Sequence, residues 1–199
     1  MNFRVTNRIR QAEPSDASAL AELINLAGEG IPSWLWARAC ADGQLPIDVG
    51  AERAKRTSGG FSYTNALVAD YLDKPVGMVL SYAITEAPTD NPDKLPAPIA
   101  PFVALEKLSV DTWYINALAV FDQGRGLGIG TCLLLAAEDL ARANGMDVMS
   151  IQVYGQNTRA LRLYERIGYE RVASEPVKEH PCPPYYTGDV LLLKKQLAI

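Results

Sequence analysis

The segment at residues 123–130 reads Gln-Gly-Arg-Gly-Leu-Gly-Ile-Gly, with a glycine at every second position. It follows a strand-like run at residues 113–120 and precedes an apolar helical pattern at residues 131–143. Glycines let a backbone turn sharply and approach a ligand without Cβ clashes. Free amides at the start of the following helix, together with its dipole, attract anions. The segment therefore predicts a phosphate or pyrophosphate site in preference to a purely structural turn.

Two well-known phosphate loops do not fit these residues. A P-loop needs a Lys followed by Ser or Thr after its last glycine, whereas Thr131 here follows Gly130 with no Lys. A Rossmann loop needs a third glycine at a spacing that is absent here, and an acid at the end of the next strand. Asp147 instead precedes that strand. Both types of nucleotide loop are therefore excluded.

The third comparison is with a known family. The strand end 118–120, Leu-Ala-Val, followed by residues 125–130, resembles the acetyl-coenzyme A motif of the GNAT N-acetyltransferase superfamily. That motif is Arg or Gln, two residues, Gly, one residue, then Gly or Ala. Gln123 begins a second match, and we prefer Arg125 because it keeps the family's spacing from the strand end. A second family signature follows as Asn157-x-x-Ala160-x-x-x-Tyr164-x-x-x-Gly168-Tyr169. The close resemblance covers about residues 113–172.

The resemblance implies acetyl-CoA as co-substrate and assigns roles to individual residues. The strand backbone would bond the pantetheine arm, the loop amides would hold the pyrophosphate, and Asn157 would contact the cofactor. Tyr164 would stand near the thioester sulfur as general acid. A tyrosine has a pKa near 10 and a thiol a pKa of about 8.5, so transfer of the proton from the phenol to the thiolate costs roughly 2 kcal/mol. The implied cofactor-binding residues are Leu118, Ala119, Val120, Arg125, Gly126, Leu127, Gly128, Ile129, Gly130, Asn157 and Tyr164.

The general base is the point where this sequence departs from the family. Many relatives carry a Glu two residues before the Leu-Ala-Val strand end, where this chain has Asn116. An amide cannot take a proton, but it can orient a water or the amine, so Asn116 and Tyr164 are the catalytic candidates. The acids nearby in sequence remain open as bases; they are Glu106, Asp111 and Asp122.

Two functions follow from these motifs. The first is acetyl-CoA-dependent transfer of an acetyl group to a primary amine by direct attack in a ternary complex. The alternative is a non-catalytic acyl-CoA-binding or sensing module of the same fold, which the missing acid at position 116 favours. The resemblance leaves a monomer and a homodimer both open.

The elements that must position these residues form an α+β pattern over a single domain, residues 1–199. We expect a GNAT-like mixed, mostly antiparallel central sheet of six to seven strands flanked by helices, with one parallel crossover. Residues 63–70 and 76–84 predict a hairpin before the motif region. Residues 86–104 contain five prolines and are expected to be an irregular lid or insertion.

Composition limits the class of protein and of partner. Of 199 residues 48% are hydrophobic, and the formal net charge is −4, which argues against nucleic-acid binding. No apolar run is long enough for a membrane span, and the first residues do not resemble a signal peptide, so we expect a cytoplasmic protein. Three cysteines lack metal-ligand spacing, so no metal site is expected, and Cys132 is expected in the core. Residues 1–112 hold 10 basic and 14 acidic side chains, which favours a cationic small-molecule or peptide amine as acceptor.

Overall fold

The computed structural model describes residues 8–91, 94–181 and 187–198. The strands and α-helices, in chain order, are β1 (Arg8–Gln11), α1 (Ala17–Ala27), α2 (Ile31–Trp36), α3 (Pro46–Ala54), β2 (Ala66–Tyr71), β3 (Lys74–Ile84), α4 (Ala100–Glu106), β4 (Thr112–Val120), α5 (Ile129–Ala143), β5 (Val148–Tyr154), α6 (Thr158–Arg166), β6 (Glu170–Pro176) and β7 (Asp189–Gln196). Short 3-10 helices lie at Pro14–Asp16, Ala37–Ala39, Tyr63–Asn65, Lys107–Ser109 and Asp122–Gly124.

Within the described residues, seven strands form one sheet in the order β1-β2-β3-β4-β5-β7-β6. The pairs β1–β2, β2–β3, β5–β7 and β6–β7 are antiparallel, whereas β4 and β5 are parallel. The α5 helix makes the crossover that a parallel pair requires. The expected α+β class, the mostly antiparallel sheet and the single parallel crossover are confirmed.

Chain contacts divide the protein into two compact units that interleave in sequence. Unit 1 comprises residues 1–81 and 117–137, and unit 2 comprises residues 82–116 and 138–199. The boundaries between the units fall within β3, β4 and α5.

Unit 1 is built around α1, whose apolar side chains recur at helical spacing. Leu20, Leu23 and Ile24 are at most 1% exposed, and α1 packs on α3. An ion-pair network ties the first strand to its neighbours: the Arg10 guanidinium bonds Asp70 at 2.6 Å and Asp16 at 2.8 Å. These contacts fix the start of α1 against β1 and β2.

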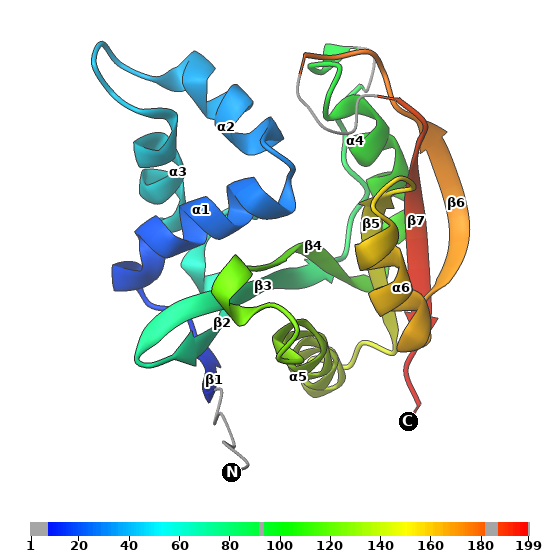
Figure 1. The fold of residues 1–199 in the computed structure, drawn as a ribbon. Helices are drawn as coiled ribbons and strands as arrows, with labels where there is room; N and C mark the ends of the chain where they lie inside the picture. The colour runs from blue at the N-terminus through cyan, green and yellow to red at the C-terminus, as the bar shows by residue number, and fades with distance from the viewer. Residues whose placement is uncertain (1–7, 92–93, 182–186, 199) are drawn as a thin grey trace. The chain divides into compact units, whose positions relative to one another are not determined.

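Unit 2 is built on β5, β7 and β6, which lie side by side in Figure 1. The β5–β7 ladder runs from Val148↔Gln196 to Tyr154↔Val190. Two pairs of buried polar groups join neighbouring elements: Thr112 Oγ1 lies 2.6 Å from Ser150 Oγ, and Lys195 Nζ lies 2.6 Å from Glu138 Oε1. These pairs hold β4 against β5 and β7 against α5.

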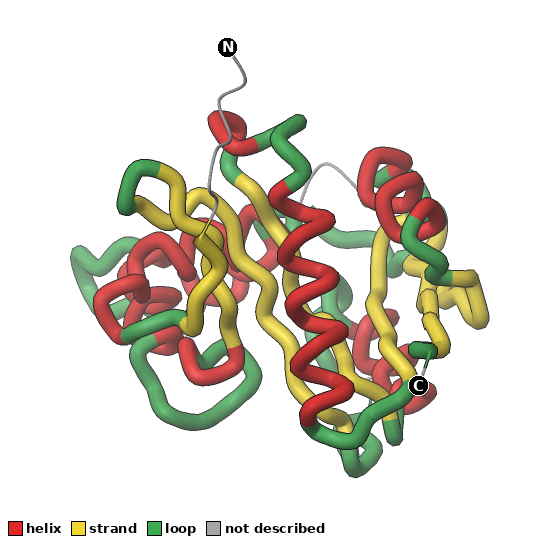
Figure 2. Tube along the Cα trace, turned by 90° about the horizontal axis from the view of Figure 1, so that it is seen from below, coloured by secondary structure: helices red, strands yellow, loops and turns green. Residues whose placement is uncertain are grey.

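Two expectations were wrong. The α4 helix begins at Ala100, inside the proline-rich segment predicted to be irregular, because Pro101 lies in the first turn, where no backbone N–H is needed. Cys132 is exposed, on the polar side of α5 (the longest helix, which runs along the strands in Figure 2). Among the described helices, none combines the length and apolar character needed to cross a bilayer.

Candidate active site

The glycine segment forms a turn that leads from β4 into α5, as the sequence predicts. Gly126 and Gly128 have φ angles of +77° and +80°, a backbone region that glycine enters without cost. A Cβ at either position would meet no atom within 4 Å, so only the backbone conformation requires glycine there. The Cys132 amide donates to the Gly128 carbonyl at 3.1 Å, so the helical hydrogen-bond pattern of α5 begins at the end of this turn. The positive end of the helix dipole therefore lies beside the glycine turn, a setting in which a phosphate could bind.

The other loop residues divide into buried and exposed positions. Ile129 is 1% exposed and contributes only its backbone to a ligand, whereas Leu127 is 47% exposed. The Arg125 side chain turns back onto the protein: Nε donates to the Val120 carbonyl at 3.2 Å, and the guanidinium pairs with Asp122. The Arg125 amide is also used within the turn, because it donates to the Asp122 carbonyl at 3.2 Å. Both the amide and the guanidinium of Arg125 are therefore engaged by the protein itself.

The end of β4 continues beyond its pairing with β5. The parallel ladder joins Trp113, Tyr114 and Ile115 to Met149, Ser150 and Ile151. The strand then runs on through Leu118, Ala119 and Val120, of which Ala119 is buried and the other two are half-buried. This extension carries the backbone that the family resemblance assigns to the pantetheine arm.

The second predicted motif lies in unit 2, at the start of α6. Asn157 is the N-cap of this helix, because its Oδ1 accepts a hydrogen bond from the Ala160 amide at 3.1 Å. Capping fixes the orientation of the side chain and does not exclude a contact with a cofactor.

Tyr164 is 6% exposed, and its ring packs against Tyr169 with centroids 6.1 Å apart. Burial raises the pKa of the Tyr164 hydroxyl above its ordinary value. A higher pKa keeps the proton on the phenol at neutral pH but makes its full transfer to a thiolate more costly. Tyr164 is therefore a protonated phenol at neutral pH, able to donate a hydrogen bond.

Asn116 lies in unit 2 beside two tyrosines that the sequence did not single out. Its Nδ2 donates to Tyr82 Oη at 3.2 Å, and the Tyr82 ring meets the Tyr114 ring edge-on with centroids 5.9 Å apart. The 34 positions between Tyr82 and Asn116 hide this pairing from any local motif. Burial, followed by the charge of Glu106, raises the pKa of Tyr82.

The three acids left open as bases differ in their surroundings. Asp111 is exposed, with a φ of +59°, and Asp122 is 86% exposed and paired with Arg125. Glu106 is half-buried at the end of α4, and burial and the charge of Asp90 raise its pKa. Glu106 is therefore the half-buried carboxyl among the three, whereas the other two are exposed.

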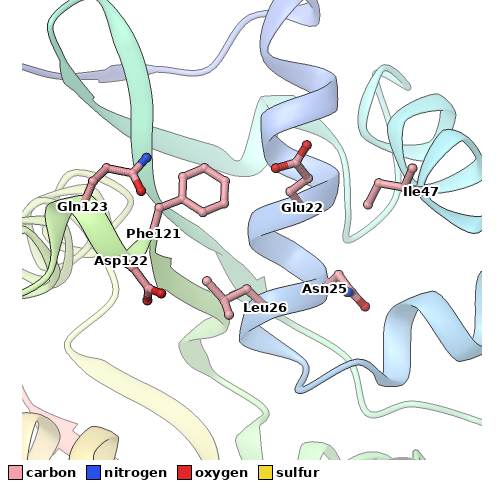
Figure 3. Close-up of a pocket in the computed structure, with 7 residues that line it drawn as sticks. All are labelled: Glu22, Asn25, Leu26, Ile47, Phe121, Asp122 and Gln123. Atoms are coloured by element: carbon pink, nitrogen blue, oxygen red, sulfur yellow. The ribbon is translucent and has the colours of Figure 1, made fainter.

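A cavity of about 390 Å³ opens in unit 1 between α1, α3 and the segment that follows β4 (Figure 3). This volume is in the range of small-molecule sites. Two carboxylates and two amides line it together with three apolar side chains; the seven residues are Glu22, Asn25, Leu26, Ile47, Phe121, Asp122 and Gln123. The excess of negative charge suits a positively charged ligand.

Comparison with known proteins agrees with this geometry. The model of the Acetyltransferase (GNAT) family matches residues 33–169, which is more than half of the chain. The chain therefore belongs to the GNAT acetyltransferase family, and it is an N-acetyltransferase.

Individual relatives extend this result. The protein named uncharacterized N-acetyltransferase YhfO of Bacillus subtilis (strain 168) is 29% identical over 162 residues, covering 81% of this chain and 89% of its own. A solved agmatine N-acetyltransferase variant in its apo form aligns with a TM-score of 0.70 and 16% identity, over 96% of this chain and 99% of its own. The structure of yncA from Salmonella typhimurium with its cofactor acetyl-CoA aligns with a TM-score of 0.63 and 19% identity, over 98% of this chain and 95% of its own. The last two show that the fold is shared.

Proposed function

We propose that this protein transfers the acetyl group of acetyl-CoA to a primary amine by direct attack in a ternary complex. The observation that carries the proposal is the turn before α5, where two glycines at positive φ lead into the N-terminus of a fifteen-residue helix, at the positive end of its dipole. Such a turn fits the pyrophosphate of acetyl-CoA. The acetyl-CoA in the yncA structure supports the same co-substrate here.

The residues of this chain would divide the work as follows. The backbone from Leu118 to Gly130 binds the pantetheine arm and pyrophosphate, and Asn157 adds a polar contact. Asn116 orients the amine or a water. Tyr164 donates a hydrogen bond to the sulfur as the carbon–sulfur bond breaks, so that coenzyme A leaves as a thiol.

The acceptor would be a cationic small-molecule or peptide amine. Glu22 and Asp122 give the cavity of unit 1 its negative charge, and the first 112 residues of the chain are acidic. We further propose that the protein consists of a single domain and acts in the cytoplasm.

A thiol-release screen with acetyl-CoA and a chemically diverse set of amines tests this function. We expect thiol release that depends on the amine, with diamines and guanidino amines ahead of neutral and acidic ones. Acetyl-CoA should also raise the unfolding midpoint, because a ligand that binds the folded state stabilises it. Absence of both effects would contradict the proposal.

A second candidate, a non-catalytic acyl-CoA-binding or sensing module, draws on one observation. The residue at the position where relatives often carry a base is Asn116, whose amide is hydrogen-bonded to Tyr82. Acetyl-CoA that stabilises the fold but releases no thiol with any amine would favour this candidate.

A further inference from the structure

The face of unit 2 that lies beneath α4 carries polar groups that the family motifs do not include. Phe102 and Glu106 are four residues apart on α4 and therefore share one side of the helix. The Phe102 ring meets the Tyr154 ring edge-on, with centroids 5.2 Å apart. This side of α4 thus faces β5, and Glu106 lies over the same surface of the sheet.

The strand register extends this surface to β4. Ser150 and Tyr154 lie on one face of β5, because side chains alternate along a strand. Ser150 is opposite Tyr114, so Tyr114 and Asn116 belong to the same face. Tyr82 lies on β3 and contacts both residues, so β3 contributes to the same surface. We call Tyr82, Glu106, Tyr114 and Asn116 the α4-side cluster.

The electrostatics of the cluster agree with this placement. Burial raises the pKa of Glu106 first, and the negative charge of Asp90, on the loop before α4, raises it further. Burial is also the main cause that raises the pKa of Tyr82 and of Tyr114, and the charge of Glu106 contributes to both. The charge of Asp90 therefore acts on Glu106, and the charge of Glu106 acts on the phenols of Tyr82 and Tyr114. A carboxylate of this kind is a better proton acceptor at neutral pH than an exposed one.

A neighbouring amide indicates that this face receives a polar ligand. Gln152 lies between Ser150 and Tyr154 on the same face of β5, and its Oε1 and Nε2 are buried. Neither atom has a hydrogen-bond partner within the described part of the chain. Buried amides are nearly always paired, and within the described residues the side-chain amide of Gln152 is left available to a polar ligand.

We propose that Glu106 is the base that accepts the proton of the acceptor amine, on the face that carries Tyr82, Asn116 and Gln152. This proposal rests on the acetyltransferase function proposed above. The ammonium ion gives one proton to the Glu106 carboxylate, and the neutral nitrogen bonds to the thioester carbonyl carbon. The carbon–sulfur bond breaks, the thiolate takes a proton from Tyr164, and the second nitrogen proton restores the Tyr164 phenol. Glu106 then releases its proton to water.

The test compares Glu106→Gln with Asp111→Asn, a matched loss of one carboxylate five positions away, at an exposed site. General bases commonly contribute 100-fold or more, so we expect Glu106→Gln to lower kcat about 100-fold at pH 7. The rate of this variant should recover as pH rises toward the pKa of the amine. Asp111→Asn should keep the rate of the wild type. Both variants should bind acetyl-CoA as the wild type does, measured by calorimetry.

Three results of this test would decide whether Glu106 is the base. A Glu106→Gln variant with the rate and pH profile of the wild type would overturn Glu106 as the base and leave the acetyltransferase function standing. A wild type that releases no thiol with any amine would overturn the function, and the base with it. If Glu106→Gln does not fold, the pH dependence of kcat/KM of the wild type is the test. The proposal requires that kcat/KM rise with pH through an ionisation whose pKa lies above the ordinary carboxyl range. A pH profile without this ionisation contradicts the proposal.

Discussion

Replacing Gly128 by alanine changes the loop at one backbone angle and at no packing contact. The φ angle is +80°, and a Cβ built there meets no atom within 4 Å. The cost is therefore conformational, about 1–2 kcal/mol for an L-residue in the left-handed region. For a chain of this size each kcal/mol lowers the unfolding midpoint by about 2–4 °C.

The loop would relieve this strain by turning the peptide units that, in the proposed complex, bind the pyrophosphate. Loss of one amide–phosphate hydrogen bond costs about 1.5–3 kcal/mol, which is about a 10- to 100-fold rise in the Kd for acetyl-CoA. Isothermal calorimetry measures the Kd, and thermal unfolding measures the stability.

Gly145 supplies the control. Its φ is +73°, nothing lies within 4 Å of a Cβ, and it follows the other end of α5. Gly145→Ala should lose the same stability and keep the Kd. Equal affinities for the two variants would refute the assignment of the pyrophosphate to the loop amides.

Three further predictions concern single side chains. Tyr164→Phe should bind acetyl-CoA as the wild type does and should lower the rate of thiol release about 100-fold, measured with a thiol reagent at fixed times. An unchanged rate would contradict the role of Tyr164 as proton donor. Asp16→Asn should cost about 2 kcal/mol at pH 7, because the hydrogen bond from Arg10 lowers the pKa of Asp16. This stabilisation is present above the ordinary Asp pKa and is lost as the pH falls through the lowered pKa of Asp16. The unfolding midpoints of the wild type and Asp16→Asn should therefore converge in acid, and a difference in midpoint that does not change with pH would contradict this reasoning. Glu22→Gln should raise KM for a cationic acceptor about two- to fivefold, and less at high salt, whereas an equal effect on a neutral amine would contradict a charged contact.

The sequence was most informative where chemistry depends on local backbone. The strand end at Leu118–Val120 and the glycine turn lie on the strand and at the helix start that the local pattern predicts, and Asn157 caps α6. A positive φ and an N-cap are short-range requirements, so they leave a mark within a few residues.

What the sequence hid depends on distant parts of the chain. The hydrogen bond between Tyr82 and Asn116 needs β3 beside β4, and the place of Glu106 needs α4 over the sheet. The α4 helix itself lies partly in a segment that its prolines appeared to exclude, because Pro101 occupies a position in the first turn that tolerates it. Cys132 was placed in the core from the apolar character of its helix, but it lies on the exposed side.

Amine-dependent release of coenzyme A tests the central claim most directly. Purified protein, acetyl-CoA and a panel of amines are followed with a thiol reagent, and the product of an active amine is weighed by mass spectrometry. We expect thiol and N-acetylated amine in equal amounts, with cationic amines preferred. Tight binding of acetyl-CoA with neither product from any amine would contradict it.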